Sequence, residues 1–287
     1  MQNNFFVKSH GLGNDYIVLD SANISFTLSK ETIVRICDIH YGIGSDGILL
    51  KTSSTKADFG IRIFNPDGSE AEKSGNGLRI FSKFLYDFDF TESKSFTIET
   101  LSGIVKAEIL EEKFGKAQNI KVDMGKAEFI AKYIPVISEK EECIGEQITI
   151  ADKTFLINCV SVGNPHCVIL TDEIDETIVK TYGPLLEKHP KFPNKINVQF
   201  AKVISPNEVQ VQIWERGAGY TLASGSSSCA VACVLHKLGL TNNEVTINMP
   251  GGNLEITIDK DWNIKMTGQV REIASGIISN ELIEDCK

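Results

Sequence analysis

Short segments of alternating apolar and polar residues, the pattern typical of half-buried β-strands, recur along the chain. Residues 61–65 (IRIFN) and 211–215 (VQIWE) both show this alternation, and they begin 211 − 61 = 150 positions apart. Residues 16–19 and 167–170 are apolar runs that each follow a Gly-Asn pair, and the two pairs begin 163 − 13 = 150 positions apart. The pattern therefore predicts equivalent strands in two halves of one chain.

A helical pattern follows a Ser-Gly pair in each half, and the two pairs begin at Ser74 and Ser224, again 224 − 74 = 150 positions apart. Side chains three, four or seven positions apart share one face of a helix. By that spacing the residues on a common face are Leu78, Phe81 and Leu85 in the first helix, and Cys229, Cys233 and His236 in the second. Gly239 lies where it can end the second helix.

A fourth pair of segments completes the repeat, because residues 97–103 resemble residues 246–252 at an offset of 246 − 97 = 149. Four matches in one order at nearly one offset indicate an internal duplication, although two strand–loop–helix units without a common plan remain the alternative. The repeat predicts a first half that ends near residue 127 and a second that runs to about residue 271. A length of 287 residues suits two domains of about 140 residues each.

The duplication also suggests where a ligand binds. Similar halves commonly pack about a pseudo-twofold axis, and small-molecule sites favour the cleft between domains. We therefore expect Ser74 and Ser224 to face each other, each at the start of a helix. Free N–H groups and the positive end of the dipole lie at a helix start, so two such starts together would bind a carboxylate.

Composition narrows the classes of function. The chain carries 29 Lys and Arg against 38 Asp and Glu, a net charge of 29 − 38 = −9, and 42% of its residues are hydrophobic. This acidic, globular composition argues against broad nucleic-acid binding and against an anionic membrane surface, because both require basic faces. It leaves open a small acidic ligand held by backbone N–H groups and one arginine.

Seven cysteines without a CxxC motif disfavour a disulfide framework and favour a reducing compartment. The N-terminus lacks the charged start and apolar run of a signal peptide, and no stretch reaches the about 18 apolar residues of a membrane span. We therefore expect a cytoplasmic protein. Three cysteines fit small buried side chains better than nucleophiles, namely Cys167, Cys229 and Cys233.

Two segments carry the candidate chemistry. Residues 65–79 are dense in turn-forming residues, and taken alone they are better explained as a hairpin loop followed by a helix cap. Residues 214–219 (WERGAG) end an apolar strand with Glu215 and Arg216 before Gly-Ala-Gly. Arginine binds carboxylates with two parallel hydrogen bonds. Arg216 alone fits a surface ion pair, whereas beside a symmetric anion-binding loop it fits a ligand anchor.

Seven short motifs resemble those of diaminopimelate epimerase, occur in that family's order and cover the chain from residue 8 to about residue 233. They are residues 10–16 (HGLGNDY), 42–47 (GIGSDG), 64–72 (FNPDGSEAE), 75–79 (GNGLR), 163–167 (GNPHC), 197–200 (NVQF) and 214–219 (WERGAG). As a set these motifs are highly specific, whereas the short glycine motifs alone would not be.

The resemblance implies an α/β (α+β) fold of two pseudo-symmetric domains, each a mixed or antiparallel β-sheet rolled around a central helix. It returns the strand-like residues 271–279 to the first domain, which gives domains of residues 1–127 with 272–287 and of residues 128–271. The implied activity is epimerisation of LL- to meso-diaminopimelate by two-base proton transfer, in lysine and cell-wall precursor biosynthesis. The family uses no pyridoxal phosphate, metal or nucleotide, and its members are commonly homodimers.

The resemblance also assigns roles to residues of this chain. Ser74 and Ser224 fall where the family has its paired acid and base, and His166 and Glu215 match residues that tune the proton affinity of the pair. The residues that match those holding the non-reacting end of the substrate are Asn14, Asn65, Asn164, Asn197, Glu215 and Arg216. The residues that match the backbone donors around the reacting carboxylate are Gly75, Asn76, Gly225 and Ser226. Without the resemblance, His166 would be interpreted as a turn cap.

The chain departs from the family at the centre of the chemistry, because the family has cysteine at both positions that hold Ser74 and Ser224 here. A thiol becomes a thiolate after a modest pKa shift, whereas a serine hydroxyl is a far weaker acid. Tyr220 stands where the family commonly has glutamate, and Ser227 stands where it has glycine.

Three interpretations of the serines stay open. They were engineered into an epimerase whose activity they impair, or they are natural in a related racemase or dehydratase that acts on another amino acid. Alternatively, the chain binds an amino acid without turning it over. Arg216 and the four matching asparagines favour an unchanged diaminopimelate pocket over a new substrate.

Overall fold

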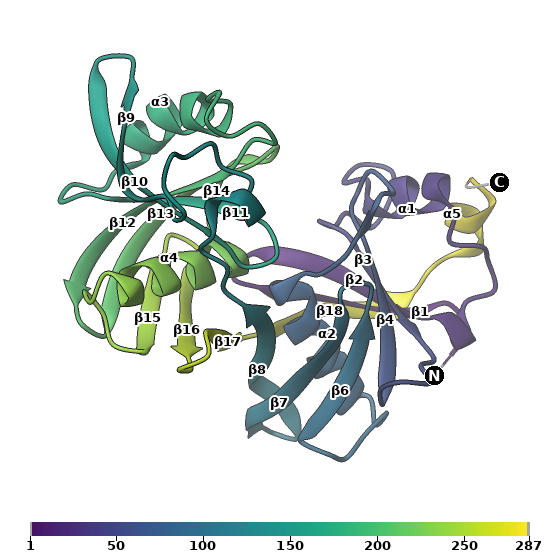
Figure 1. The fold of residues 1–287 in the computed structure, drawn as a ribbon. Helices are drawn as coiled ribbons and strands as arrows, with labels where there is room; N and C mark the ends of the chain where they lie inside the picture. Colours follow the sequence, from purple (N-terminus) through teal and green to yellow (C-terminus); the bar gives the residue numbers. More distant parts are fainter. Residues whose placement is uncertain (1, 286–287) are drawn as a thin grey trace. The chain divides into compact units, whose positions relative to one another are not determined.

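The chain divides into two units in a computed structural model that describes residues 2–285 (Figure 1). Unit 1 comprises Met1–Val122 together with Gly268–Lys287, and unit 2 comprises Asp123–Thr267. Two strands, β8 (Lys116–Lys126) and β17 (Asn263–Gln269), carry the chain from one unit to the other. Residues 1, 286 and 287, including Cys286, lie outside the described residues. The domain boundaries inferred from the repeat stay a prediction.

Each unit is built mainly from strands. The further elements of unit 1 are β1 (Phe5–Gly11), β2 (Asn14–Asp20), η1 (Ser21–Asn23), α1 (Lys30–Cys37), β3 (Ile48–Thr52), β4 (Phe59–Phe64), β5 (Glu70–Ala71), α2 (Gly75–Asp87), β6 (Ser95–Thr100), β7 (Gly103–Lys113), β18 (Arg271–Ile277) and α5 (Asn280–Glu284). Those of unit 2 are η2 (Ala131–Tyr133), β9 (Ile144–Ile150), β10 (Lys153–Ser161), β11 (Pro165–Leu170), α3 (Glu176–Glu187), β12 (Asn197–Ser205), β13 (Glu208–Glu215), β14 (Gly219–Thr221), α4 (Gly225–Lys237), β15 (Glu244–Met249) and β16 (Gly252–Ile258).

The strand pairings repeat between the two units in register as well as in order. β2 and β3 are parallel with Ile17 opposite Ile48, and β11 and β12 are parallel with Cys167 opposite Val198. Both partners shift by the same amount, since 167 − 17 = 150 and 198 − 48 = 150. The antiparallel pairs β3–β4 and β12–β13 match in the same way, as do β4–β5 and β13–β14. The predicted duplication is therefore confirmed.

The central helix of each unit is buried on all sides. Every residue of α2 from Asn76 to Leu85 is buried, and so is every residue of α4 from Ser227 to Leu235. A helix that is apolar all round must be enclosed. α2 packs against β1, β2, β3 and β7, and α4 packs against β10, β11, β12, β15 and β16. Each unit is thus a mixed sheet around one helix, as predicted.

The helix spacing predicted too narrow a buried face. Leu78, Phe81 and Leu85 are fully buried as expected, but so are the residues between them. In α4, His236 is only half-buried, and its ring lies against Trp262 with the centroids 5.6 Å apart. Gly239 ends the helix in the left-handed region at φ 71°, and its N–H donates to the His236 carbonyl, as a C-terminal glycine should.

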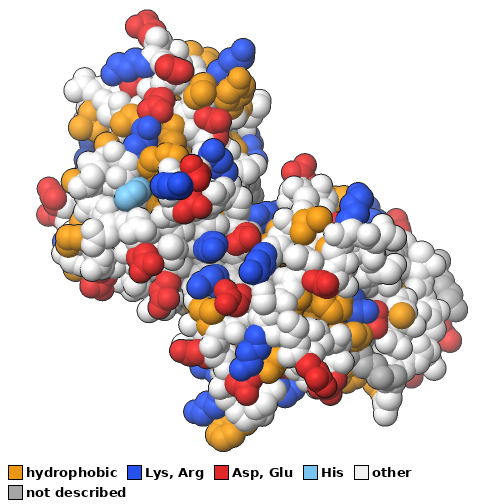
Figure 2. Space-filling view, turned by 60° about the horizontal axis from the view of Figure 1, so that its bottom comes forward, with side chains coloured by type: hydrophobic (Ala, Val, Ile, Leu, Met, Phe, Trp, Pro, Cys, Tyr) orange, Lys and Arg blue, Asp and Glu red, His pale blue; other side chains and the backbone are white. Residues whose placement is uncertain are grey.

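Charges of both signs are interspersed on the face shown in Figure 2, where red and blue side chains lie close to one another. None of the helices within residues 2–285 combines the length and apolarity needed to cross a membrane.

Candidate functional site

Ser74 and Ser224 are the N-caps of the two central helices. Both have extended backbone angles, with φ −139° and ψ 120° at Ser74 and φ −149° and ψ 126° at Ser224. The Ser74 hydroxyl accepts the Gly77 N–H at 3.0 Å, and the Ser224 hydroxyl accepts the Ser227 N–H at 3.4 Å. A serine oxygen is a preferred acceptor for these first-turn donors. The prediction that each serine starts a helix is confirmed.

Four predicted anion-binding residues form the first turns of the same helices. Gly75 and Asn76 follow Ser74, and Gly225 and Ser226 follow Ser224. The first N–H groups of a helix have no partner within the helix, and the dipole is positive there. Ser226 also places its hydroxyl 3.5 Å from that of Ser224. Each helix start can therefore present backbone donors and a hydroxyl to an acidic ligand.

Side-chain amides extend the Ser74 region in a single direction of hydrogen bonding. Arg79 is fully buried and donates to Asn76 Oδ1 at 2.7 Å. Asn76 Nδ2 then donates to Asn14 Oδ1 at 3.2 Å, and Asn14 Nδ2 donates to Asp46 at 3.0 Å. A Cβ at Gly11 would lie 3.1 Å from the Arg79 guanidinium, so the glycine makes room for it. The structure thus brings Asn14 and Asn76 together.

Tyr16 and Asn65 complete the unit 1 region. The Tyr16 hydroxyl lies 3.3 Å from the Ser74 hydroxyl, a contact that the sequence did not reveal. Asn65 instead bonds within its own turn, where its Nδ2 donates to Ser69 Oγ at 3.0 Å. Gly68 in that turn has φ 80°, which favours glycine. The hairpin-loop interpretation of this segment therefore describes its local structure correctly.

Glu215 is the ionisable group beside Ser224. It ends β13, and its carboxylate accepts hydrogen bonds from Ser224 and, at 3.0 Å, from the Thr221 hydroxyl. Burial raises the pKa of the Glu215 carboxyl above its ordinary value, and the two hydrogen bonds act in the opposite direction. A carboxylate with raised proton affinity, in contact with the Ser224 hydroxyl, can exchange a proton with the group at position 224.

His166 lies in a fully buried hydrogen-bond chain. Its Nε2 is 2.8 Å from Asn164 Oδ1, and its Nδ1 is 3.0 Å from Gln199 Nε2. Gln199 Nε2 also donates to the Ser227 hydroxyl at 3.0 Å. Burial lowers the pKa of His166 from 6.5 to about 3, so the imidazole is neutral at pH 7. The structure brings Asn164 and His166 together, and it adds Gln199 and Ser227, which sequence reasoning had not assigned to the site.

Asn197 holds the backbone of Arg216. Its Oδ1 accepts the Arg216 N–H at 2.9 Å, and its Nδ2 donates to the Pro165 carbonyl at 2.9 Å. The Arg216 side chain is exposed and donates to the Asn194 carbonyl at 3.0 Å. An exposed guanidinium with a fixed backbone is suited to binding a carboxylate from solution.

Tyr220, the second departure from the family, points its hydroxyl at the neighbouring strand. That hydroxyl donates to Gln212 Oε1 at 2.6 Å, and the Lys180 ammonium lies 5.1 Å from the ring centroid. The ring packs against the core of unit 2.

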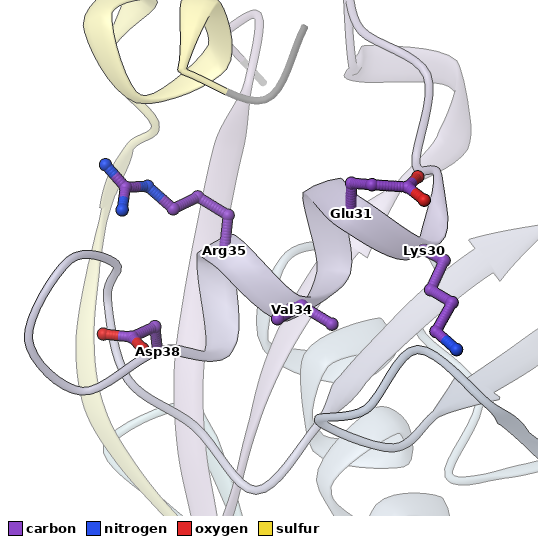
Figure 3. A pocket seen from close by; sticks show the side chains of 5 residues that line it. All are labelled: Lys30, Glu31, Val34, Arg35 and Asp38. Carbon is purple, nitrogen blue, oxygen red and sulfur yellow. The ribbon is translucent and has the colours of Figure 1, made fainter.

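A surface pocket in unit 1 lies over α1 and contains none of the predicted site residues (Figure 3). Its lining residues are Lys30, Glu31, Val34, Arg35 and Asp38. Arg35 forms an ion pair with Asp285 at 2.5 Å. Among the described residues, no group of three or more His, Cys, Asp or Glu side chains is placed to hold a metal ion.

Comparison with known proteins gives a consistent family match. A sequence profile described as Diaminopimelate epimerase matches residues 6–130 and 158–273. The chain is 49% identical to Diaminopimelate epimerase 2 from Nostoc sp. over 278 residues, which covers 96% of each chain. It is 44% identical to Diaminopimelate epimerase from Methanococcus maripaludis over 274 residues, or 95% of this chain and 99% of the relative.

A solved structure with the same fold is more distant in sequence. A probable proline racemase from Agrobacterium radiobacter aligns with a TM-score of 0.70 at 14% identity, over 96% of this chain and 93% of that chain. The similarity shows that the fold is shared.

Proposed function

The chain belongs to the diaminopimelate epimerase family, and we propose that it interconverts LL- and meso-diaminopimelate by proton transfer at one α-carbon. Inversion of that carbon needs a base on one face and an acid on the other. The observation that carries the proposal is the pair of serine N-caps, Ser74 and Ser224, at equivalent positions of two duplicated helices. They stand at the family's acid and base positions.

The helix starts would stabilise the reacting carboxylate. Removal of the α-proton places negative charge on the α-carbon and its carboxylate, and preorganised N–H donors stabilise such charge where it develops. The N–H groups of Gly75 and Asn76, and of Gly225 and Ser226, are the donors in this proposal. Because acid, base and donors all come from the chain itself, the proposed reaction uses no cofactor.

The non-reacting end of the substrate has its own binding residues in this proposal. Arg216 takes the distal carboxylate, and the side chains of Asn14, Asn65, Asn164 and Asn197 match positions that hold the same end of the substrate. The support is partial clustering, since Asn197 fixes the Arg216 backbone and Asn14 is bonded to Asn76. Anchoring of a remote carboxylate positions the α-carbon and lowers the entropic cost of reaction.

Serine at both acid and base positions should slow the reaction. A hydroxyl yields its proton far less readily than a thiol, for which pKa values near 8.5 are ordinary. Glu215 offers partial compensation at Ser224, because it contacts that hydroxyl and its own pKa is raised. We therefore propose an epimerase scaffold whose present form is impaired. The serine pair equally favours a second candidate function, an amino-acid-binding protein that does not turn its ligand over.

Restoring the cysteines separates the two candidates. The double variant Ser74→Cys with Ser224→Cys, in heavy water with LL-diaminopimelate, should incorporate α-deuterium and form the meso isomer. We expect a rate higher than that of the present chain by about 10²–10⁴-fold, the usual contribution of a positioned acid and base. A double variant that binds diaminopimelate without deuterium incorporation contradicts the epimerase proposal. Ligand-induced thermal stabilisation of the present chain, without turnover by any variant, supports the binding protein.

We also propose that the chain forms a homodimer through β18. This strand pairs with β1 and is exposed along most of its length, including 52% of Ile273 and 51% of Ile277. Exposed apolar side chains on a peripheral strand favour association with another chain. Sedimentation at micromolar concentration should give a dimer for the present chain and a monomer for Ile273→Lys. A monomeric parent chain contradicts this assembly.

The cysteines support the proposal of a cytoplasmic protein. The six cysteines within the described residues are free and buried, namely Cys37, Cys143, Cys159, Cys167, Cys229 and Cys233. Free thiols of this number fit a reducing compartment.

A further inference from the structure

Glu187 is a buried carboxylate outside all the predicted site residues. It is the last residue of α3, and only 4% of it is exposed. The free carbonyls and the negative end of the dipole lie at a helix C-terminus, which disfavours a carboxylate there. Two donors offset this cost: the Trp214 indole N–H reaches Oε2 at 2.8 Å, and the Gly217 N–H reaches Oε1 at 3.2 Å. Glu187 is therefore held by contacts, at a position that is otherwise unfavourable.

The two donors flank Arg216 in the sequence. Trp214 lies near the end of β13, and Gly217 lies in the turn that leads to β14. Gly217 has φ 82°, a left-handed conformation that favours glycine. Asn197 binds the Arg216 N–H between them. The Arg216 backbone is thus fixed by donors on both sides and at the residue itself.

The surface of α3 is shaped to receive the Trp214 ring. Gly183 precedes Glu187 by four residues, so the two share one face of the helix. A Cβ on Gly183 would lie 2.7 Å from Trp214 Cγ, which places the ring directly against the helix backbone. The backbone carbonyl of Glu187 also accepts the Ile196 N–H at 3.2 Å, next to Asn197. Both segments that hold Arg216 therefore meet at Glu187.

We propose that Glu187 is a positioning residue that sets the direction of the Arg216 side chain for the distal carboxylate of the substrate. It acts through Trp214 and Gly217 and need not touch the substrate itself. The inference rests on the proposed function, because it requires that Arg216 binds the substrate. It predicts that loss of the Glu187 carboxylate weakens substrate binding and leaves the chemistry at the α-carbon intact.

The test uses the chain that carries Ser74→Cys and Ser224→Cys. In that background Glu187→Gln removes the charge and one acceptor, so the side chain can no longer accept from both donors. We expect the KM for diaminopimelate to rise about tenfold while kcat stays within about threefold, the pattern of lost uniform binding. Glu176→Gln is the matched control, because Glu176 lies on the same helix but is exposed and paired with Lys180. It should change neither constant.

A spectroscopic readout accompanies the kinetics. The chain has two tryptophans, Trp214 and Trp262, so its ¹⁵N–¹H spectrum has two indole signals. Glu187→Gln should shift the Trp214 signal and leave that of Trp262, which packs against Phe129, in place. If Glu187→Gln does not fold, Trp214→Phe removes the indole donor and should raise KM in the same way.

The outcomes distinguish two failures. A double-cysteine parent that neither binds nor turns over diaminopimelate overturns the proposed function and this inference with it. An active parent whose KM is unchanged by both Glu187→Gln and Trp214→Phe overturns the inference alone. An equal loss of kcat with unchanged KM would likewise exclude a positioning role through Arg216.

Discussion

The two central helices begin with the same backbone but with different chemical neighbours. At an offset of 166 − 16 = 150 the duplication places Tyr16 in unit 1 and His166 in unit 2. At an offset of 215 − 65 = 150 it places Asn65 and Glu215. Tyr16 contacts Ser74 as a neutral phenol, whereas Glu215 contacts Ser224 as a carboxyl whose pKa is raised by burial. The repeat has kept the strand register and varied the proton chemistry.

A smaller difference lies in the cap itself. The position two residues into the helix is Gly77 in unit 1 and Ser227 in unit 2, and the cap distance is 3.0 Å in the first and 3.4 Å in the second. A Cβ on Gly77 would lie 3.1 Å from the Ser74 hydroxyl and from Leu49, so a side chain there crowds the cap. Ser227 carries such a Cβ, which accounts for the longer distance at Ser224.

Removing the carboxylate from one half and the phenol from the other should have unequal effects on activity. In the double-cysteine chain we expect Glu215→Gln to lower kcat by about 10²–10⁴-fold, because a group at position 224 loses a partner that can hold its proton. Tyr16→Phe should lower kcat by less than about tenfold, since it removes one neutral hydrogen bond. Isomer formation measured by chiral chromatography checks both. Equal losses would show that the two halves are chemically equivalent.

Acid should destabilise the chain through His166. Its pKa is about 3 in the folded chain and 6.5 ordinarily, so the unfolded chain binds the extra proton below pH 6.5 and stability falls as the pH falls toward 3. The slope approaches about 1.4 kcal/mol per pH unit, or about 2 kcal/mol by pH 5. Urea unfolding from pH 7 to pH 5 should show this slope, and His166→Gln should flatten it.

His40→Gln is the control for that experiment, because His40 is exposed. It should leave the slope unchanged. A His166→Gln variant with the slope of the parent chain would mean that His166 is protonated in the folded state.

Loss of the cap should cost less than either change above. Ser74→Ala removes the acceptor for the Gly77 N–H and should lower the free energy of unfolding by about 1 kcal/mol. Ser74→Gly should cost only a few tenths of that, because glycine is itself tolerated as an N-cap. Thermal unfolding of the two variants in parallel provides the measurement. If alanine and glycine cost the same, the hydroxyl does not act as a cap.

Local patterns predicted the elements of the site better than their partners. The Ser-Gly pairs and helical spacing located both N-caps, because a cap depends on residues three apart in sequence. The partners of those caps depend on strand pairing. Gln199 lies in a motif that the sequence does show, yet its contact with His166 follows from the parallel register of β11 and β12. Glu187 is still less visible, since its donors are 27 and 30 residues away.

The central claim is that Ser74 and Ser224 are the two proton-transfer positions. Its most direct test uses the single variants Ser74→Cys and Ser224→Cys, each incubated in heavy water with LL- or with meso-diaminopimelate. Mass spectrometry then measures α-deuterium in the recovered substrate. The account predicts that one variant exchanges the α-proton of one isomer and the other variant that of the other isomer, because each thiolate serves one face of the carbon. Exchange of the same isomer by both variants, or of neither isomer by either, would contradict it.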